Sequence, residues 1–263
     1  MTIRKGYVDT RDGQVHYRVC PGAGPALVFL HKTASSSAMW EQVMRALSGR
    51  YHMVALDTPG FGGSFDPVDV PDVGYYCEVF TQALDGLGLE RFHLCGHHTG
   101  ASAAVQMAAQ APARVRSLAM FGPVQMTAGE REAFRERFSG AIFPRADGGH
   151  LQETWDYLAA LGADRSLELH HRELLDTVRA WRGRAMAYAA VWEQDFPALY
   201  AQVACPVLLM AARDDVLWPF LERARAEHPG ARAVAVDGAN FEPDLDPEGV
   251  VAALRNFLAR TEP

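Results

Sequence analysis

The chain contains little cysteine and no pattern of residues that would hold a metal. Its four cysteines are widely spaced and form no Cys-x-x-Cys pair, so we expect reduced, mostly buried thiols rather than a disulfide framework or a zinc site. The histidines His170 and His171 have no spaced carboxylate partner that would complete a ligand set. We therefore expect that the protein uses no metal and no other cofactor.

An excess of basic charge and long hydrophobic runs are also missing. The 263 residues include 25 Lys and Arg against 32 Asp and Glu, a net charge of -7, which argues against nucleic acid or an anionic membrane as a partner. No apolar segment of the secretory type follows the first residues, and no stretch provides a membrane span. The sequence predicts a cytoplasmic protein, a monomer or homodimer, that acts on a small molecule.

Short apolar runs alternate with helical patterns along most of the chain. Asp12-Gly13 lies between two alternating segments and predicts a hairpin. Continuous apolar runs then predict strands buried on both faces, and apolar residues at helical spacing predict helices between them. The strand-like runs are residues 26–30, 53–56, 92–95, 118–121, 207–210 and 233–236. This alternation predicts an α/β fold with a mostly parallel sheet.

The pattern changes between residues 124 and 200, where charged and aromatic helical segments contain no strand-like run. We interpret this stretch as a helical cap inserted into a core that comprises residues 1–123 and 201–263. Its aromatic residues are expected to pack mainly with one another and to enclose an apolar pocket. Trp192 is the one that we assign to substrate binding.

Five short segments at the ends of the expected strands contain the candidate catalytic and binding residues. The most informative is Gly96-His97-His98-Thr99-Gly100, because small residues on both sides of a central residue are what a sharp strand-to-helix turn requires. The others are residues 31–33, 57–64, 212–219 and 238–241.

In this order the five segments resemble the α/β-hydrolase superfamily, and together they span nearly the whole chain. The resemblance implies a mostly parallel twisted sheet flanked by helices, with an inserted helical cap. It places His98 where the family has its nucleophilic serine and Asn240 where the family has its catalytic histidine. Asp215 fits the family's acid position, with Asp214 as the adjacent alternative. Because the amide of Asn240 has no useful basicity, a Ser-His-Asp proton relay cannot be assembled.

The two departures look complementary, and they suggest a different use of the same site. We expect His98 to act as a general base, with Asn240 orienting its ring and Asp215 behind Asn240. The resemblance implies an oxyanion hole formed by the backbone N–H groups of Thr33 and Thr99. Lys32 stands where the family usually has glycine and is assigned to substrate binding.

These residues leave three functional hypotheses open. The first is a hydrolase-like enzyme that acts on a small carbonyl or ester compound without an acyl-enzyme intermediate. The second is a non-hydrolytic enzyme, such as a lyase, cyclase, isomerase or decarboxylase, that uses the same base and oxyanion hole. The third is a pseudoenzyme that binds a ligand without turnover. Fold resemblance alone does not choose among them, because function resides in the site.

Overall fold

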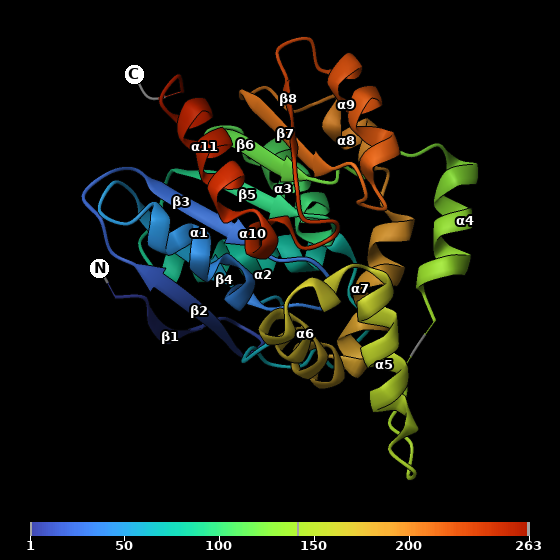
Figure 1. Cartoon of the computed structure of the whole chain (residues 1–263). Coiled ribbons are helices and arrows are strands. Elements are labelled where there is room, and N and C mark those ends of the chain that lie inside the picture. The colour runs from blue at the N-terminus through green and yellow to red at the C-terminus, as the bar shows by residue number, and fades with distance from the viewer. Residues whose placement is uncertain (1, 141, 262–263) are drawn as a thin grey trace.

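The computed structural model describes residues 2–140 and 142–261, and an eight-stranded sheet forms its centre (Figure 1). The strands lie in the order β1-β2-β4-β3-β5-β6-β7-β8. Strand β2 is antiparallel to both of its neighbours, and the remaining neighbours pair in parallel. The strands are β1 (Arg4–Asp9), β2 (Gln14–Cys20), β3 (Ala26–Leu30), β4 (His52–Leu56), β5 (Phe92–His97), β6 (Val115–Phe121), β7 (Val207–Ala212) and β8 (Arg232–Val236).

The predicted hairpin and mostly parallel sheet are confirmed. Strands β1 and β2 pair from Arg4 with Val19 to Asp9 with Gln14, and the Asp12-Gly13 turn connects them. Each continuous apolar run noted in the sequence lies within one of the parallel strands. Strands β3, β4, β5 and β7 are almost wholly buried because helices cover both faces of the sheet.

Successive side chains of the central strands point to opposite faces and build two cores. Val28 and Leu30 pack with helices α2 (Val73–Gly86) and α3 (Thr99–Gln110). Leu27 and Phe29 pack with η1 (Ser37–Trp40), α1 (Glu41–Ala46) and α11 (Pro247–Leu258). Figure 1 shows α1 and α11 together on the near face of the sheet. The short helix α9 (Leu221–Glu227) joins the first core, and α10 (Glu242–Leu245) precedes α11.

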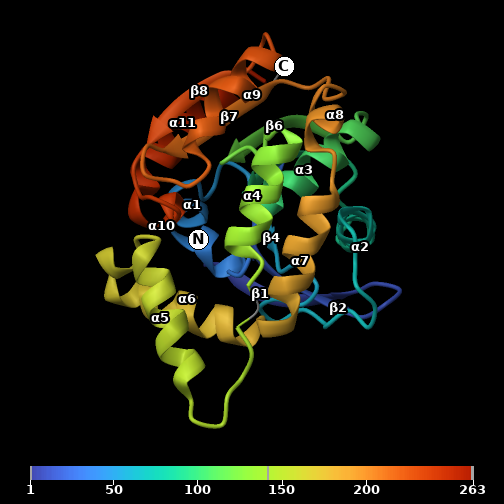
Figure 2. The same cartoon turned by 90° about the vertical axis from the view of Figure 1, so that its right-hand side faces the viewer.

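The segment 124–200 connects β6 to β7 and contains only helices among its described residues. These are α4 (Ala128–Phe138), α5 (Gly149–Ala160), η2 (Ala163–Arg165), α6 (Leu167–Arg179), α7 (Trp181–Glu193) and α8 (Phe196–Tyr200). Figures 1 and 2 show α4 to α7 gathered beyond one end of the strands. Its assignment as a separate cap domain stays a prediction. In the described ranges, no helix is both long enough and apolar enough to cross a membrane.

Candidate active site

The order of the strands brings together two loops that are far apart in the sequence. Strand β3 lies between β4 and β5, and Leu30 of β3 pairs with Gly96 of β5. The loop after β3 therefore lies beside the turn after β5, as expected where strand order reverses in an α/β sheet. The backbone N–H of Thr33 donates to the Oγ1 of Thr99 at 2.8 Å, and the two hydroxyl oxygens are 3.0 Å apart.

His98 lies at the apex of a sharp turn between β5 and α3. Its φ of 48° falls in the left-handed region, which histidine adopts more readily than most residues. The flanking glycines are required by space, because a Cβ on Gly96 would lie 2.4 Å from the carbonyl oxygen of Gly100. A Cβ on Gly100 would lie 2.5 Å from the carbonyl oxygen of Leu30. This is the turn that the glycine spacing predicted.

The ring of His98 contacts the carboxylate that follows β7. Its Nε2 lies 2.7 Å from Oδ2 of Asp215, whose side chain is fully buried, while the His98 side chain remains 15% exposed. The other carboxylate oxygen, Oδ1, accepts the backbone N–H of Leu217 at 2.5 Å. Both carboxylate oxygens of Asp215 are thus engaged. The adjacent Asp214 is half exposed and pairs with Arg165, so Asp215 is the carboxylate that reaches the site.

Asn240 lines the same cavity as His98, but its hydrogen bonds differ from the ones we expected. We predicted that Asn240 would orient His98 with Asp215 behind it, but Asp215 contacts the ring directly. The amide of Asn240 instead accepts the N–H of Val216 at 3.3 Å and donates to the carbonyl of Leu161 at 3.1 Å. The histidine ring at the turn is long enough to reach Asp215 without an intermediate. Asn240 therefore joins the loop after β7 to the helical segment.

A buried histidine and a buried carboxyl group lie behind Asp215. The Nε2 of His97 is 2.8 Å from Oε2 of Glu242, and both side chains are fully buried. Burial and the negative charge of nearby Asp215 raise the pKa of Glu242 well above its usual value. Burial and neighbouring His98 hold the pKa of His97 well below the usual value. The raised pKa favours the uncharged form of Glu242, in which Asp215 has no second negative charge beside it.

His98 lines a small cavity under the helical segment, and this cavity has about 60 Å³ of free space. Trp192 and Lys32, which we assigned to substrate binding, both line it together with Asn240. The indole of Trp192 stacks on Tyr188 at 5.9 Å and donates to the hydroxyl of Ser139. The cavity also includes Thr33, Thr99, Val124, Phe134, Phe138, Tyr157, Leu158, Leu161, Glu173, Thr177, Arg184, Val191, Val216 and Leu217.

Lys32 is buried and paired. Its ammonium lies 2.8 Å from Oε2 of Glu173 and 4.2 Å from the ring centre of Phe241. Burial alone would raise the pKa of Glu173, but the positive charges of Lys32 and Arg172 outweigh it and lower the pKa to about 2. Arg172 also binds Asp244 through two hydrogen bonds of 2.6 and 2.8 Å. These two cations and two carboxylates neutralise one another.

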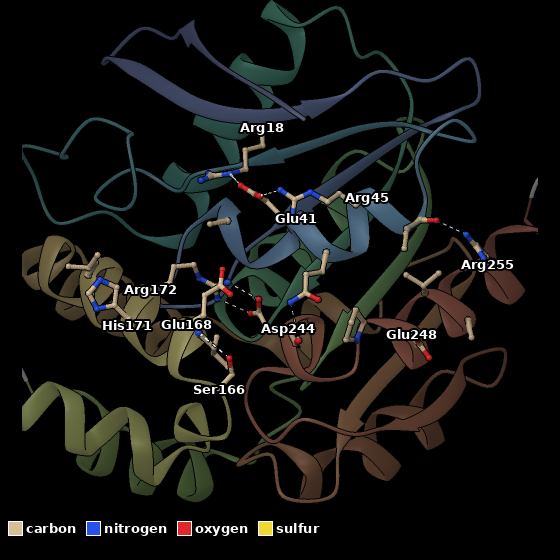
Figure 3. A pocket seen from close by; sticks show the side chains of 18 residues that line it. Arg18, Glu41, Arg45, Ser166, Glu168, His171, Arg172, Asp244, Glu248 and Arg255 are labelled. Atoms are coloured by element: carbon tan, nitrogen blue, oxygen red, sulfur yellow. Dashed lines mark hydrogen bonds and ion pairs between the residues drawn. The ribbon is translucent and has the colours of Figure 1, made fainter. Parts of the chain in front are cut away.

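A second and larger hollow lies on the surface between α1, α6 and α11, as Figure 3 shows. This groove has a volume of about 1210 Å³ and does not include His98. Within the groove, Glu41 bridges Arg18 and Arg45. Figure 3 also shows Arg172 facing Asp244 in this groove. The groove and the cavity thus share the cluster that contains Arg172. Among the described residues, His171 of the groove pairs with no carboxylate, in contrast to His98.

Across residues 2–140 and 142–261, no group of three or more His, Cys, Asp or Glu side chains is placed to hold a metal ion. His170 stacks on Trp155 with ring centres 3.6 Å apart and contacts its carbonyl oxygen.

Four residues that shape the site were not singled out from the sequence. Glu173 carried a signal, because it occupies a position on the apolar side of its helix. Arg184 lies in a helix with apolar residues on all sides, so its position gave no such signal. Leu169 and Thr177 lie one turn on either side of Glu173 and are buried with it. Glu242 begins the short helix α10 and Gly122 directly follows β6, and neither gave a periodic signal.

Comparison with known proteins agrees with this architecture. A model of the alpha/beta hydrolase fold family matches residues 25–219. Fluoroacetate dehalogenase from Burkholderia sp is 29% identical over 92% of this chain and 89% of that protein. Pimeloyl-[acyl-carrier protein] methyl ester esterase from Nitrosomonas europaea is 30% identical over 75% of this chain and 80% of that protein.

The fold also matches solved structures. The enol-lactonase from Burkholderia xenovorans superposes with a TM-score of 0.84, over 97% of this chain and 100% of that chain, at 20% identity. A likeness at this identity concerns the fold alone. The family model covers most of the chain and includes the turn at His98 and the loop with Asp215. The chain belongs to the α/β-hydrolase family.

Proposed function

We propose that this protein is an enzyme that hydrolyses a small ester or related carbonyl compound, with His98 as a general base. The observation that carries the proposal is the 2.7 Å contact between His98 Nε2 and the buried Asp215. The names of the relatives support hydrolysis, since they include a dehalogenase and a methyl ester esterase. His98 stands at the position of the serine of the usual relay and Asn240 at the position of its histidine, so in this proposal the imidazole of His98 acts on water directly.

The contact with Asp215 determines which nitrogen is basic. A carboxylate only accepts hydrogen bonds, so Nε2 carries the proton that points to Asp215 and Nδ1 keeps its lone pair. Among the described residues Nδ1 has no hydrogen-bond partner, and His98 lines the cavity. The negative charge of Asp215 also stabilises the imidazolium that forms when Nδ1 accepts a proton.

The reaction follows from this arrangement. Nδ1 of His98 takes a proton from a water molecule, and the resulting hydroxide attacks the carbonyl carbon of the substrate. The carbonyl oxygen becomes an oxyanion in the tetrahedral intermediate. When the intermediate collapses, the bond to the leaving oxygen breaks and the imidazolium returns its proton to that oxygen.

The oxyanion is assigned to the backbone N–H groups of Thr99 and Thr33. The Thr99 N–H belongs to the first turn of α3, where N–H groups have no partner within the helix. The Thr33 N–H donates to the hydroxyl of Thr99, so this hydroxyl rotates away before the substrate oxygen takes its place. Trp192 and Lys32 line the cavity as substrate contacts, and Asn240 links Val216 to Leu161 at its wall.

The segment 124–200 acts in this proposal as a cap over the core formed by residues 1–123 and 201–263. Two hydrogen bonds join its helix α6 to the loop after β3. The hydroxyl of Ser35 donates to Oε1 of Glu173 at 2.8 Å, and the hydroxyl of Ser36 donates to Oδ2 of Asp176 at 2.8 Å. These contacts close the cavity over His98. Exclusion of bulk water strengthens the electrostatic interactions inside it.

The test is hydrolysis of small acyl esters, beginning with p-nitrophenyl acetate, by the wild type and by variants of the base. His98→Gln should lower kcat about 10²- to 10⁴-fold, the range for a positioned general base. Asp215→Asn should also lower kcat, whereas its matched control Asp214→Asn should not. Asn240→Ala should cost less than either active-site change.

If His98→Gln kept full activity on an ester that the wild type hydrolyses, the general-base mechanism would be wrong. Equal losses in Asp215→Asn and Asp214→Asn would show that loop structure, and not the contact with His98, is responsible.

A further inference from the structure

The charges around the cavity are compensated at every point except one. Lys32 is neutralised by Glu173, and Arg172 by Asp244. Asp215 faces the His98 ring, and the pair of His97 and Glu242 is neutral overall. The exception is Arg184 of α7, which lines the same cavity and has no carboxylate partner among the described residues.

Arg184 is buried, with 4% of its surface exposed. Its NH2 donates to the carbonyl of Phe138 at 3.1 Å and its NH1 donates to the carbonyl of Gly140. These carbonyls lie at the C-terminal end of α4, where the helix carries partial negative charge. The guanidinium also lies 5.3 Å from the ring centre of Tyr157 and 5.0 Å from that of Tyr188.

These contacts orient Arg184 but give its charge no anionic partner among the described residues. A guanidinium has five N–H donors, and the two carbonyl bonds engage two of them. Carbonyls and aromatic faces supply partial charges, while a buried cation is fully compensated only by a paired anion. A planar fork with free N–H groups matches a carboxylate, which it binds through two parallel hydrogen bonds.

We infer that Arg184 binds a carboxylate group of the substrate, so that the substrate is a small carbonyl compound that also carries a carboxylate. This inference rests on the proposed function for the identity of the reacting carbonyl at His98. The anion lies toward α7 and the carbonyl lies toward His98, because the negative charge of Asp215 repels a carboxylate from that end. Lys32 does not take this role, because Glu173 already binds its ammonium.

A purely structural role for Arg184 makes a different prediction. If Arg184 only held the end of α4, its loss would weaken binding of charged and neutral ligands alike. If it binds a carboxylate, its loss removes the preference for the charged ligand. The ratio of two affinities therefore separates the two roles, whereas stability does not.

The experiment is calorimetric titration with levulinate, which has a ketone and a carboxylate, and with levulinamide, its uncharged analogue. The wild type should bind levulinate at least about tenfold more tightly, as expected for hydrogen bonds to a charged group. Arg184→Gln should reduce this preference to less than about threefold. Arg182→Gln, an exposed position on the same helix, should keep it. If Arg184→Gln does not fold, Arg184→Met provides the same loss of charge with an apolar side chain.

His98→Gln separates this inference from the proposed function, because neither probe is hydrolysed. It should keep the preference for levulinate even if the general-base mechanism is wrong. Equal affinity of the wild type for both probes, or no detectable binding of levulinate, overturns the inference. A preference that persists in the Arg184 variants overturns it as well.

Discussion

Gly122 lies directly against the ring of His98. A Cβ on Gly122 would be 2.5 Å from Cδ2 and 2.7 Å from Nε2 of that ring. Gly122 also has a φ of +58°, which other residues rarely adopt. The absence of a side chain at the end of β6 is thus what allows the ring at the turn after β5 to reach Asp215.

Gly122→Ala should therefore displace the His98 ring and weaken its contact with Asp215. We expect kcat/KM to fall about 10- to 100-fold, as for misplacement of a catalytic group. Unfolding stability should fall by about 1–3 kcal/mol from backbone strain. Steady-state kinetics and urea unfolding measure the two effects.

Gly88 provides the matched control. It has a φ of +71°, but a Cβ added there would meet no atom within 4 Å, so Gly88→Ala introduces strain without a clash. It should lose stability and keep full activity. Normal kinetics in Gly122→Ala would show that the ring tolerates the added methyl group.

Fluorophosphonate reagents should not label this protein. They trap serines that a neighbouring histidine activates, and the position of that serine holds His98. Ser35, Ser37 and Ser102 are buried and do not occupy that position. Intact-mass spectrometry after incubation with a fluorophosphonate should show unmodified protein, with a serine esterase as the positive control. Stoichiometric labelling at any serine would mean that the active centre lies elsewhere.

Glu242→Gln should be tolerated, because burial and Asp215 keep the pKa of Glu242 high and its carboxyl group neutral. An amide preserves the acceptor for the N–H of Ala212 at 3.2 Å and can donate to the ring of His97. We expect a stability change below about 1 kcal/mol and little change in kcat. Glu242→Ala should cost about 2–5 kcal/mol, because it leaves a cavity and unpaired polar groups. Similar losses in both variants, measured by urea unfolding, would indicate an ionised carboxylate.

Asp176→Asn should stabilise the protein at alkaline pH. Burial and the negative charge of Glu173 raise the pKa of Asp176 from 3.8 to about 7. Between these two values the folded state holds a proton that the unfolded state releases, so stability falls as pH rises from about 4 to 7. Asparagine removes this cost and can still accept the hydroxyl of Ser36.

The difference in melting temperature between Asp176→Asn and the wild type should be largest near pH 8 and shrink toward pH 4. Asp69→Asn, at an exposed position, is the control and should show no such trend. A difference that is constant with pH would contradict the raised pKa.

The elements of the fold could be predicted because their causes are local. A short continuous apolar run such as residues 26–30 is typical of a strand covered on both faces, and the structure has β3 there. The Asp12-Gly13 turn requires no distant partner, and the glycines at positions 96 and 100 are needed wherever a strand turns sharply into a helix. These features explain why the sequence alone identified the sheet and placed His98 at the turn after β5.

The partners of the site residues were decided by tertiary structure. Asp215, not Asn240, contacts His98. This contact depends on how His98, Gly122 and Asp215, which follow three different strands, are placed relative to one another in the fold. Lys32 pairs with Glu173, which lies 141 positions away in the sequence. The local sequence pattern predicts which side chains face inward. Which of the inward-facing charges contact one another depends on how the helices pack over the sheet. For that reason the candidate base could be identified from sequence, whereas its carboxylate partner and the uncompensated charge of Arg184 emerged only from the packed structure.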